Sequence, residues 1–588
     1  MALKAMCELV EYDRTNDARF DGTLLKESVM MFHIFDVYLT RFEPEFLNQS
    51  VEYFKKFGQE GSTSSLKNYI LACERLLQKE DHRCNAYNLD STTKKQLLDA
   101  AHKILIEEYA EKLLDGNSLF KLLAENETES MKALFDLLGL SGLQKRLKAP
   151  WCNYIEKTGA AIVSDTGRGD EMVLRLLELR RRLDLMVRDA FGNEDDFLWG
   201  LRESFGRFMN DDKTAASWGS GTSKVGEMIA KYIDLLLRGG LKSLPAELLS
   251  DSKDRQAAEQ SGQVSASDED AELDRQLDQA LELFRFVRGK AAFEAFYKKD
   301  LARRLLMGRS ASQDAERNML AKLRGECGSN FTHNLEQMFK DQSLGREEME
   351  TYGEWCEASG TGKWSGGLQV MILSAAAWPS HPDARINLPP DVAQQMDRFD
   401  TYYKNKYTGR LLHWKHALSH CVIKATFPKG TKELVVSAFQ AVVLFLFNNK
   451  KPESVLSYDE ISAATGLKGA ELTRTLQSLA LGKTRVLTKL PKGKDMKGSD
   501  TFTVNLSFSD PKYRVKINQI QLKETREENN ATHERIAQDR RFETQAAIVR
   551  IMKSRKSMGH AELVAEVINL TKSRGSVDAQ AIKKEIER

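Results

Sequence analysis

Amphipathic helical periodicity dominates the first 249 residues of the chain. In one segment after another, apolar residues recur three, four and seven positions apart, which places their side chains on one face of a helix. Two of these rows are Leu97, Ala101, Ile104, Leu105 and Tyr109, and Met172, Leu176, Leu179 and Leu183. No strand-like alternation separates the helices, so the pattern predicts a stalk of stacked helical repeats over residues 1–249.

Residues 250–272 break this pattern, because they are polar and charged and contain no large apolar side chain. A segment of that composition buries too little surface to offset its ordering entropy, so we predict a linker.

Helical spacing resumes at Leu273. Ser312 is a predicted N-cap and Gly328 a predicted helix end. Several helices joined by short turns predict a helical bundle over residues 273–390.

Strand signals first occur beyond Pro390. Leu411–Lys415 and His420–Phe427 are two β-prone runs, and the second alternates in part between apolar and polar residues. The strongly apolar run Glu433–Phe447 follows and predicts a helix. Strands and helices therefore mix in this part of the chain, in contrast to everything before it.

A winged helix is predicted next, in the order helix, helix, helix, hairpin. Its second and third helices and its strands are marked by the capping box of Ser457 and Glu460, the row Leu472, Leu476 and Leu479, and the runs Arg485–Lys489 and Thr501–Val504. We expect a mixed α/β region with this winged helix over residues 391–522. A second, incomplete winged-helix unit is expected over residues 523–588. The predicted fold class is mainly α, elongated and multidomain.

Composition narrows the possible functions. The 588 residues exceed what one hydrophobic core accommodates. The 87 Lys and Arg residues nearly balance the 85 Asp and Glu residues, which argues against a global attraction to nucleic acid or to a membrane surface. No apolar run approaches the ~20 residues needed to span a bilayer. The seven scattered cysteines form no CxxC pair and indicate reduced thiols, so we expect the protein in the nucleus and cytoplasm.

No local motif predicts catalysis, a metal or a cofactor. His413, His416 and His420 lie close together beside Cys421, but their spacing falls on predicted strands, and structural histidines are the favoured interpretation. Catalysis through a thioester-forming cysteine is disfavoured as well, because Cys327 and Cys421 lie in predicted structural segments. The residue patterns by themselves therefore predict no catalytic site.

Four stretches resemble the cullin family, and the type-4 cullins most closely. They are residues 283–328, 472–487, 513–525 and 545–556, the last reading QAAIVRIMKSRK, and they occur in the family's order and spacing. The resemblance implies a non-catalytic scaffold subunit of a cullin-RING ubiquitin ligase, acting in ubiquitin-dependent protein catabolism. Its N-terminal repeats would bind substrate adaptors, and its C-terminal region would bind a RING-finger subunit. Attachment of a ubiquitin-like protein, neddylation, would activate the complex.

Lys553 is the candidate modification site. At about 100° per residue, Ile548, Ile551 and Met552 share one face of the helix predicted around 545–556, and Lys553 lies roughly 140–150° from the centre of that face. The geometry alone favours an ordinary solvated lysine. The match across QAAIVRIMKSRK reverses this preference, since in the family this lysine forms the isopeptide bond with the ubiquitin-like protein.

Candidate residues for RING-subunit binding follow from the same resemblance. The segment Leu411–Phe427 corresponds to the part of cullins that accepts a strand from the RING subunit, which requires an open sheet edge. Leu412, Trp414, Val422 and Ile423 are the candidates for side-chain contacts. Burial of these four in the domain's own core is an equally weighted alternative.

The rival function is that of a winged-helix nucleic-acid-binding or chromatin protein. The basic loop with Lys492, Lys494 and Lys497 resembles a wing. The near-neutral net charge and the absence of an Arg, Lys, Asn or Gln row on a recognition helix argue against this function.

Both ends depart from the family pattern. The first helical repeat, which carries the adaptor-binding helices in cullins, is expected to be largely missing, and this puts binding of a substrate adaptor in doubt. The family's final strand pair is also expected to be missing after Ile582 and Ile586. We therefore expect Leu563, Val567, Ile582 and Ile586 to lose cover and the C-terminal helices to fray.

Overall fold

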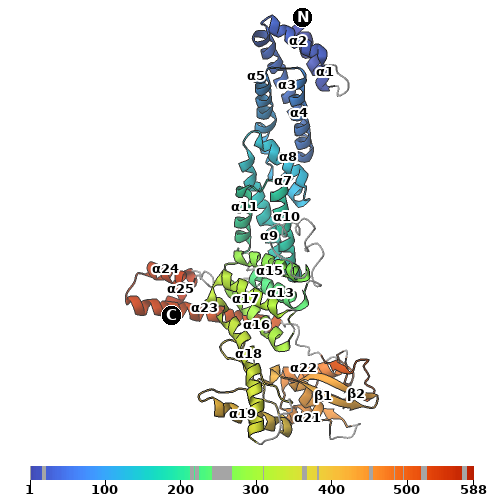
Figure 1. Cartoon of the computed structure of the whole chain (residues 1–588), viewed down its shortest axis with the longest axis vertical. Helices are drawn as coiled ribbons and strands as arrows, with labels where there is room; N and C mark the ends of the chain where they lie inside the picture. Colours follow the sequence, from blue (N-terminus) through green and yellow to red (C-terminus); the bar gives the residue numbers. More distant parts are fainter. Residues whose placement is uncertain are drawn as a thin grey trace. The chain divides into compact units, whose positions relative to one another are not determined.

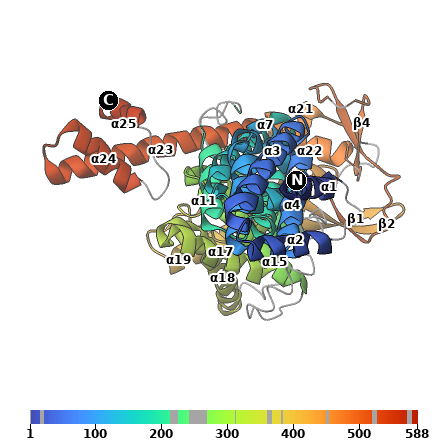
Figure 2. The same cartoon turned by 90° about the horizontal axis from the view of Figure 1, so that it is seen from above.

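The computed structural model describes residues 2–15, 22–211, 218, 224–240, 268–308, 310, 312–359, 367–380, 383–448, 454–482, 484–493, 495–517, 526–571 and 579–587. They divide into two compact units (Figures 1 and 2). The first unit runs to Ile229 and includes Asp278–Arg288. The second begins at Ala230, includes the described residues up to Leu277, and continues from Gly289. None of the described helices is both long and apolar enough to cross a membrane.

The first unit is a stack of helices. They are α1 (Ala2–Thr15), α2 (Thr23–Ile34), α3 (Glu43–Ser62), α4 (Leu66–Ala86), α5 (Ser91–His102), α6 (Ala110–Leu113), α7 (Gly116–Ala124), α8 (Thr128–Gly139), α9 (Lys148–Ser164), α10 (Met172–Asp189) and α11 (Asp195–Phe208). Each contacts neighbours close to it in chain order, as α3 contacts α5 and α9 contacts α11. The predicted stack of helical repeats is therefore confirmed.

The predicted apolar rows form the core of this stack. All four residues of the α10 row are buried, and so are those of the α5 row except Tyr109, which is half-buried. The α5 row continues without a break through a π-helical turn, Lys103–Glu107. Arg180 of α10 packs on two aromatic rings. Its guanidinium lies over the rings of Phe205 and Phe286, 5.7 and 5.9 Å from their centroids.

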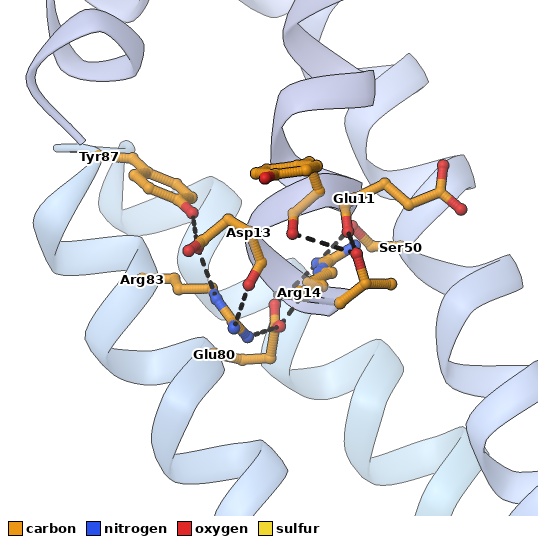
Figure 3. Close-up of polar contacts among 9 residues, drawn as sticks. Glu11, Asp13, Arg14, Ser50, Glu80, Arg83 and Tyr87 are labelled. Atoms are coloured by element: carbon orange, nitrogen blue, oxygen red, sulfur yellow. Dashed lines mark hydrogen bonds and ion pairs between the residues drawn. The ribbon is translucent and has the colours of Figure 1, made fainter. Parts of the chain in front are cut away.

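A buried charge network holds α1 against α3 and α4 (Figure 3). The Arg14 guanidinium donates to both carboxylate oxygens of Glu80, at 2.7 and 3.1 Å, and to Ser50 Oγ at 3.0 Å. Arg83 joins Glu80 to Asp13 with hydrogen bonds of 2.9 Å to each. Glu80 is only 1% exposed, so its charge depends on these two guanidinium groups for compensation.

Removal of this carboxylate should loosen α1. In Glu80→Ala, Arg14 loses its buried counter-ion, and breaking such a pair costs about 3 kcal/mol or more. We expect faster hydrogen exchange of the α1 amides, measured by mass spectrometry on the full chain. The matched control is Glu52→Ala, which breaks an exposed 3.5 Å pair with Lys55 and should cost less than about 1 kcal/mol. Equal effects of the two substitutions would contradict this assignment.

Two helices belong to both units. They are α13 (Lys224–Gly239) and α15 (Asp268–Phe286). Because α15 begins at Asp268, the predicted linker is wrong for residues 268–272, while residues 250–267 lie outside the described residues. Asp270 and Glu272 lie in the first turns, where the helix dipole favours negative charge, and Glu272 pairs with Arg275 at 2.8 Å. Acidic residues that resemble a linker in sequence thus begin a helix.

The second unit continues with a helical bundle that includes α16 (Lys290–Met307), α17 (Gln313–Cys327) and α18 (Ser329–Ala358). Ser312 caps α17, as predicted, by accepting hydrogen bonds from the backbone N–H groups of Asp314 and Ala315. Gly328 ends α17 with a φ of 84°, also as predicted. The buried Arg304 ties three helices together through Glu316 at 2.6 Å and Asp234 at 2.6 Å.

Beyond the bundle, α19 (Pro390–Lys406) lies beside α18 (Figure 1), and two small sheets follow. One has the order β1 (His420–Phe427), β2 (Gly430–Ser437) and β6 (Arg514–Lys516), with β1 antiparallel and β6 parallel to β2. The other, β3 (Leu456–Ser457), β5 (Thr501–Val504) and β4 (Leu487–Leu490), completes the winged helix with α20 (Ala438–Phe445), α21 (Tyr458–Thr465) and α22 (Gly469–Ala480). The mixed α/β region is therefore confirmed.

Two element predictions in this region are wrong. The predicted helix Glu433–Phe447 begins only at Ala438, because Glu433–Ser437 belongs to β2. Ser437 and Gln440 form a capping box that starts the helix there, and β-branched residues favour the strand before it. The other error is Leu411–Lys415, which pairs with no strand among the described residues.

The C-terminal part consists of α23 (Arg526–Arg555), α24 (His560–Thr571) and α25 (Ala579–Ile586). The predicted loss of cover is wrong for Leu563, Val567 and Ile582, which are all buried, while Ile586 is half-buried. The reason is mutual packing, since these residues form one cluster with Ile551 of α23. The three helices cover each other's apolar faces.

Candidate partner-binding surface and modification site

An extended segment without a strand partner runs along α18 in the second unit. Leu368, Val370 and Ile372 point inward and are half-buried, whereas Gln369 and Met371 are exposed. This alternation is that of a β-strand. No described residue pairs with the segment in a ladder, so part of its backbone polarity has no strand partner among the described residues.

A second extended segment, residues 411–415, shows the same alternation. Leu412 and Trp414 are half-buried, and Leu411 and His413 are exposed. The Trp414 indole N–H donates to Asp400 Oδ1 at 3.2 Å. Leu412 and Trp414 therefore contribute to the domain's own core, the alternative that the sequence left open. Only the backbone of this segment and its outward side chains face away from that core.

Both segments pack on one aromatic cluster of α18 and α19. Its buried members are Met349, Tyr352, Cys356, Phe399, Tyr402 and Tyr403. The first segment contributes Leu368, Val370 and Ile372, and the second contributes Leu412 and Trp414. Two extended backbones thus share one apolar base, and neither belongs to a sheet formed by described residues.

Strand β1 provides a third open backbone, because it is an edge strand of its sheet. Val422 is 45% exposed, on the same face as His420, Lys424 and Thr426. Ile423 points the other way and packs against the core of this region. Of the four candidate contact residues, only Val422 therefore presents its side chain to solvent.

We call the segments 368–373 and 411–415 together with β1 the receiving surface.

The buried carboxylate of Asp341 fixes the first segment to α18. Its Oδ2 accepts hydrogen bonds from Ser374 N at 2.9 Å, Ser374 Oγ at 2.7 Å and Trp378 Nε1 at 2.8 Å. Gln337 donates to the other carboxylate oxygen at 2.8 Å. Burial raises the pKa of Asp341, but the hydrogen bonds from Ser374, Gln337 and Trp378 outweigh it and hold this pKa below its usual range.

Glu348, two turns further along α18, fixes the end of α19 in the same way. It accepts hydrogen bonds from the hydroxyl groups of Tyr402 and Tyr407 at 2.7 and 2.9 Å and pairs with Lys406 at 3.0 Å. Burial raises the pKa of Glu348. The interactions with these three donors lower it by more, so this pKa lies below its usual range. Sequence reasoning missed both carboxylates, because a single acidic residue on a helix gives no signal of burial.

Lys553 is exposed in the last turn of α23, two residues before its end at Arg555, as helix geometry predicts. Ile551 is buried on the opposite side, and Ile548 and Met552 are half-buried. Lys553 forms no ion pair with any described residue, whereas Arg555, nearby, pairs with Glu566 of α24 at 3.4 Å. The amine is therefore free to approach an external reaction partner.

Helix α22 of the winged helix presents no row of basic side chains. Its charged residues, Glu471 and Arg474, are half-buried and pair with each other at 4.0 Å. In the basic loop, Lys492 and Lys497 are exposed, and Lys494 lies outside the described residues.

His416 is half-buried, and burial lowers its pKa. Nowhere among the described residues do three His, Cys, Asp or Glu side chains gather as metal ligands would.

Comparison with known proteins agrees with this arrangement. Residues 1–349 match the Cullin alpha solenoid domain, residues 372–508 the Cullin alpha+beta domain and residues 539–588 the Cullin protein neddylation domain. The chain belongs to the cullin family. The receiving surface of this cullin lies largely in the second of these domains, although Leu368–Met371 fall outside it. Lys553 lies in the third.

Type-4 cullins are among the similar proteins. This cullin is 38% identical to Cullin-4A of Mus musculus over 582 residues, which is 98% of its own chain and 71% of the relative's. Cullin-4A of Homo sapiens gives the same identity and shares. Cullin-4 of Schizosaccharomyces pombe is 34% identical over 569 residues, covering 97% of this cullin and 73% of the relative.

The two buried carboxylates should make the second unit acid-sensitive. In the folded chain the pKa values of both carboxyl groups lie below their ordinary values of 3.8 and 4.5. The stability that the two ionised groups give the folded state is therefore complete above these ordinary values. It is lost as pH falls through the lower pKa values of the folded state. At neutral pH, Glu348→Gln should lower the free energy of unfolding by about 1.5–3 kcal/mol. Urea titrations from about pH 7 to about pH 3 should show this deficit shrinking as the wild-type carboxyl protonates. A deficit independent of pH would contradict the assignment.

Proposed function

We propose that this cullin is the non-catalytic scaffold subunit of a cullin-RING ubiquitin ligase, acting in ubiquitin-dependent protein catabolism in the nucleus and cytoplasm. Its second unit binds a RING-finger subunit, and its N-terminal repeats bind a substrate adaptor. The scaffold raises the effective concentration of substrate near the loaded conjugating enzyme, so that a bimolecular transfer becomes nearly intramolecular.

The observation that carries the proposal is the receiving surface. It combines an edge strand with two extended segments that form no strand ladder with other described residues, all within one unit. A strand from another protein would satisfy these donors and acceptors, as in other cases of strand addition. Val422 is available for side-chain contact with that strand, whereas Leu412, Trp414 and Ile423 support the surface from below.

Co-expression with a RING-finger subunit tests this proposal. The full chain should co-purify with the subunit, and Val422→Lys should weaken the complex, because it places a charge where an apolar contact is expected. Val455→Lys, the same change at an exposed valine outside the receiving surface, is the matched control and should bind as the wild type does. Failure of the wild-type chain to bind any RING-finger subunit would refute the scaffold function.

Covalent modification forms the second part of the proposal. We propose that the ε-amine of Lys553 forms an isopeptide bond with the C-terminal carboxyl group of a ubiquitin-like protein, which activates the ligase. The amine attacks the thioester of the loaded conjugating enzyme, the thiolate leaves, and the ammonium proton passes to solvent. The exposure of Lys553 and the match of residues 539–588 to the neddylation domain support this site.

Lys553→Arg should abolish modification in a reconstituted reaction with the RING-finger subunit, the conjugating enzyme and the ubiquitin-like protein. Arginine keeps the positive charge but has no amine that attacks a thioester at neutral pH. Lys556→Arg, three residues away and also exposed, is the control and should be modified as the wild type is. Modification of Lys553→Arg at wild-type yield would remove this site assignment.

A further inference from the structure

The outward face of α2, at the N-terminal end of the helical stack, is largely apolar (Figure 1). Leu25 and Val29 point inward and are buried, whereas large apolar residues on the opposite side of the helix are exposed. The exposed apolar residues of α2 and of the turn that follows it are between 52% and 76% exposed, and they are Leu24, Met30, Met31, Ile34, Phe35 and Leu39. We call these six residues the α2 patch.

The α2 patch is large for a surface that faces water. Single exposed apolar residues are normal, but a contiguous patch above a few hundred Å² marks an interaction surface. Covering six large side chains that are each more than half exposed would bury roughly 700 Å² on each copy of a dimer, close to the ~800 Å² per partner of standard interfaces. The end of a helical stack normally has a polar outer face, and the α2 patch is the opposite.

Two charged residues flank the patch symmetrically. Lys26 and Asp36 are both exposed and lie five positions before and five positions after Met31. Neither forms an ion pair with a described residue. When two α2 helices pack antiparallel about Met31, Lys26 of one copy lies opposite Asp36 of the other copy, and the reverse pair forms at the other end. Two-fold packing therefore pairs both charges twice and leaves the apolar side chains between them.

We propose that the α2 patch is a self-association surface, on which α2 of a second copy of this chain packs antiparallel about a two-fold axis near Met31. The six apolar side chains supply most of the binding energy, and the ion pairs between Lys26 and Asp36 fix the register. Glu27 lies on the outward face between Leu24 and Met31, so its carboxylate loses water on association and limits the affinity. The inference goes beyond the proposed function, because it requires no RING-finger subunit.

The oligomeric state of the full chain, purified without partners, tests this surface. Analytical ultracentrifugation should show a concentration-dependent dimer with twice the mass of one chain. Ile34→Lys places a charge in the patch twice per dimer, so it should weaken the dimer by about a hundredfold or more. Leu140→Lys introduces the same charge at an exposed apolar residue of the first unit outside the α2 patch, and this control should associate as the wild type does.

Exchange of the two flanking charges tests the antiparallel register. Lys26→Asp and Asp36→Lys each place like charges opposite one another at both ends of the interface, so each should weaken the dimer by about fivefold or more. The double variant restores opposite charges and should return to within about twofold of the wild type. Such a rescue within one chain is specific to a second copy, because a different protein would not change its own charges.

Glu27→Ala removes the carboxylate from the outward face and should tighten the dimer by about threefold or more. A wild-type chain that stays monomeric at about 100 μM would overturn the inference. Wild-type association of Ile34→Lys, or additive losses in the double charge variant, would overturn it as well. A monomeric chain that binds a RING-finger subunit would leave the proposed function intact, so the two failures are distinguishable.

Discussion

An extended backbone carries a hydrogen-bond donor and an acceptor at each residue, and these groups must find partners. In this cullin, helices satisfy most of them internally, and the two small sheets satisfy others. Residues 368–373 and 411–415 are different, because they are extended, they pack on a shared aromatic cluster, and they lie in no ladder among the described residues. Their lack of a strand-pairing partner among the described residues is the physical basis for expecting a strand from another protein.

Buried carboxylates fix the positions of several segments of this chain that apolar packing alone would not define precisely. Glu80 fixes α1 through two arginines, Glu316 and Asp234 surround Arg304, and Asp341 and Glu348 fix the two sides of the receiving surface. Apolar contacts are non-directional, whereas a carboxylate with three or four aligned donors specifies one position for each donor. The scaffold function requires such precision, because its contribution is geometry.

Much of this fold could be predicted from the sequence. Periodicity identified the helical stack, and capping residues such as Ser312 and Ser457 marked helix starts correctly, because these signals are local. The helix predicted at Glu433–Ser437 was wrong because apolar runs are compatible with both helix and strand, and pairing with β1 decided between them. Leu411–Lys415 has strand-like residues but no strand partner among the residues that the structure describes, which no local pattern reveals.

The candidate site was only partly predictable. Helix geometry was sufficient for the exposure of Lys553, since that depends on one amphipathic helix. The inward orientation of Leu412 and Trp414 depends on residues of α18 and α19 more than ten positions away, and the roles of Asp341 and Glu348 depend on donors 33 and more residues away. Such contacts arise only when the chain has folded.

Hydrogen exchange of the full chain, alone and bound to a RING-finger subunit, tests the central claim most directly. The account predicts an alternating response. The N–H groups of Gln369, Met371 and Leu373 donate to no described residue, so they should exchange rapidly in the free chain and about tenfold or more slowly in the complex. The N–H groups of Val370 and Ser374 donate to Met349 Sδ and Asp341 Oδ2, so their exchange should change little. Unchanged exchange at all five positions on binding, or protection of the three outward amides in the free chain, would contradict the account.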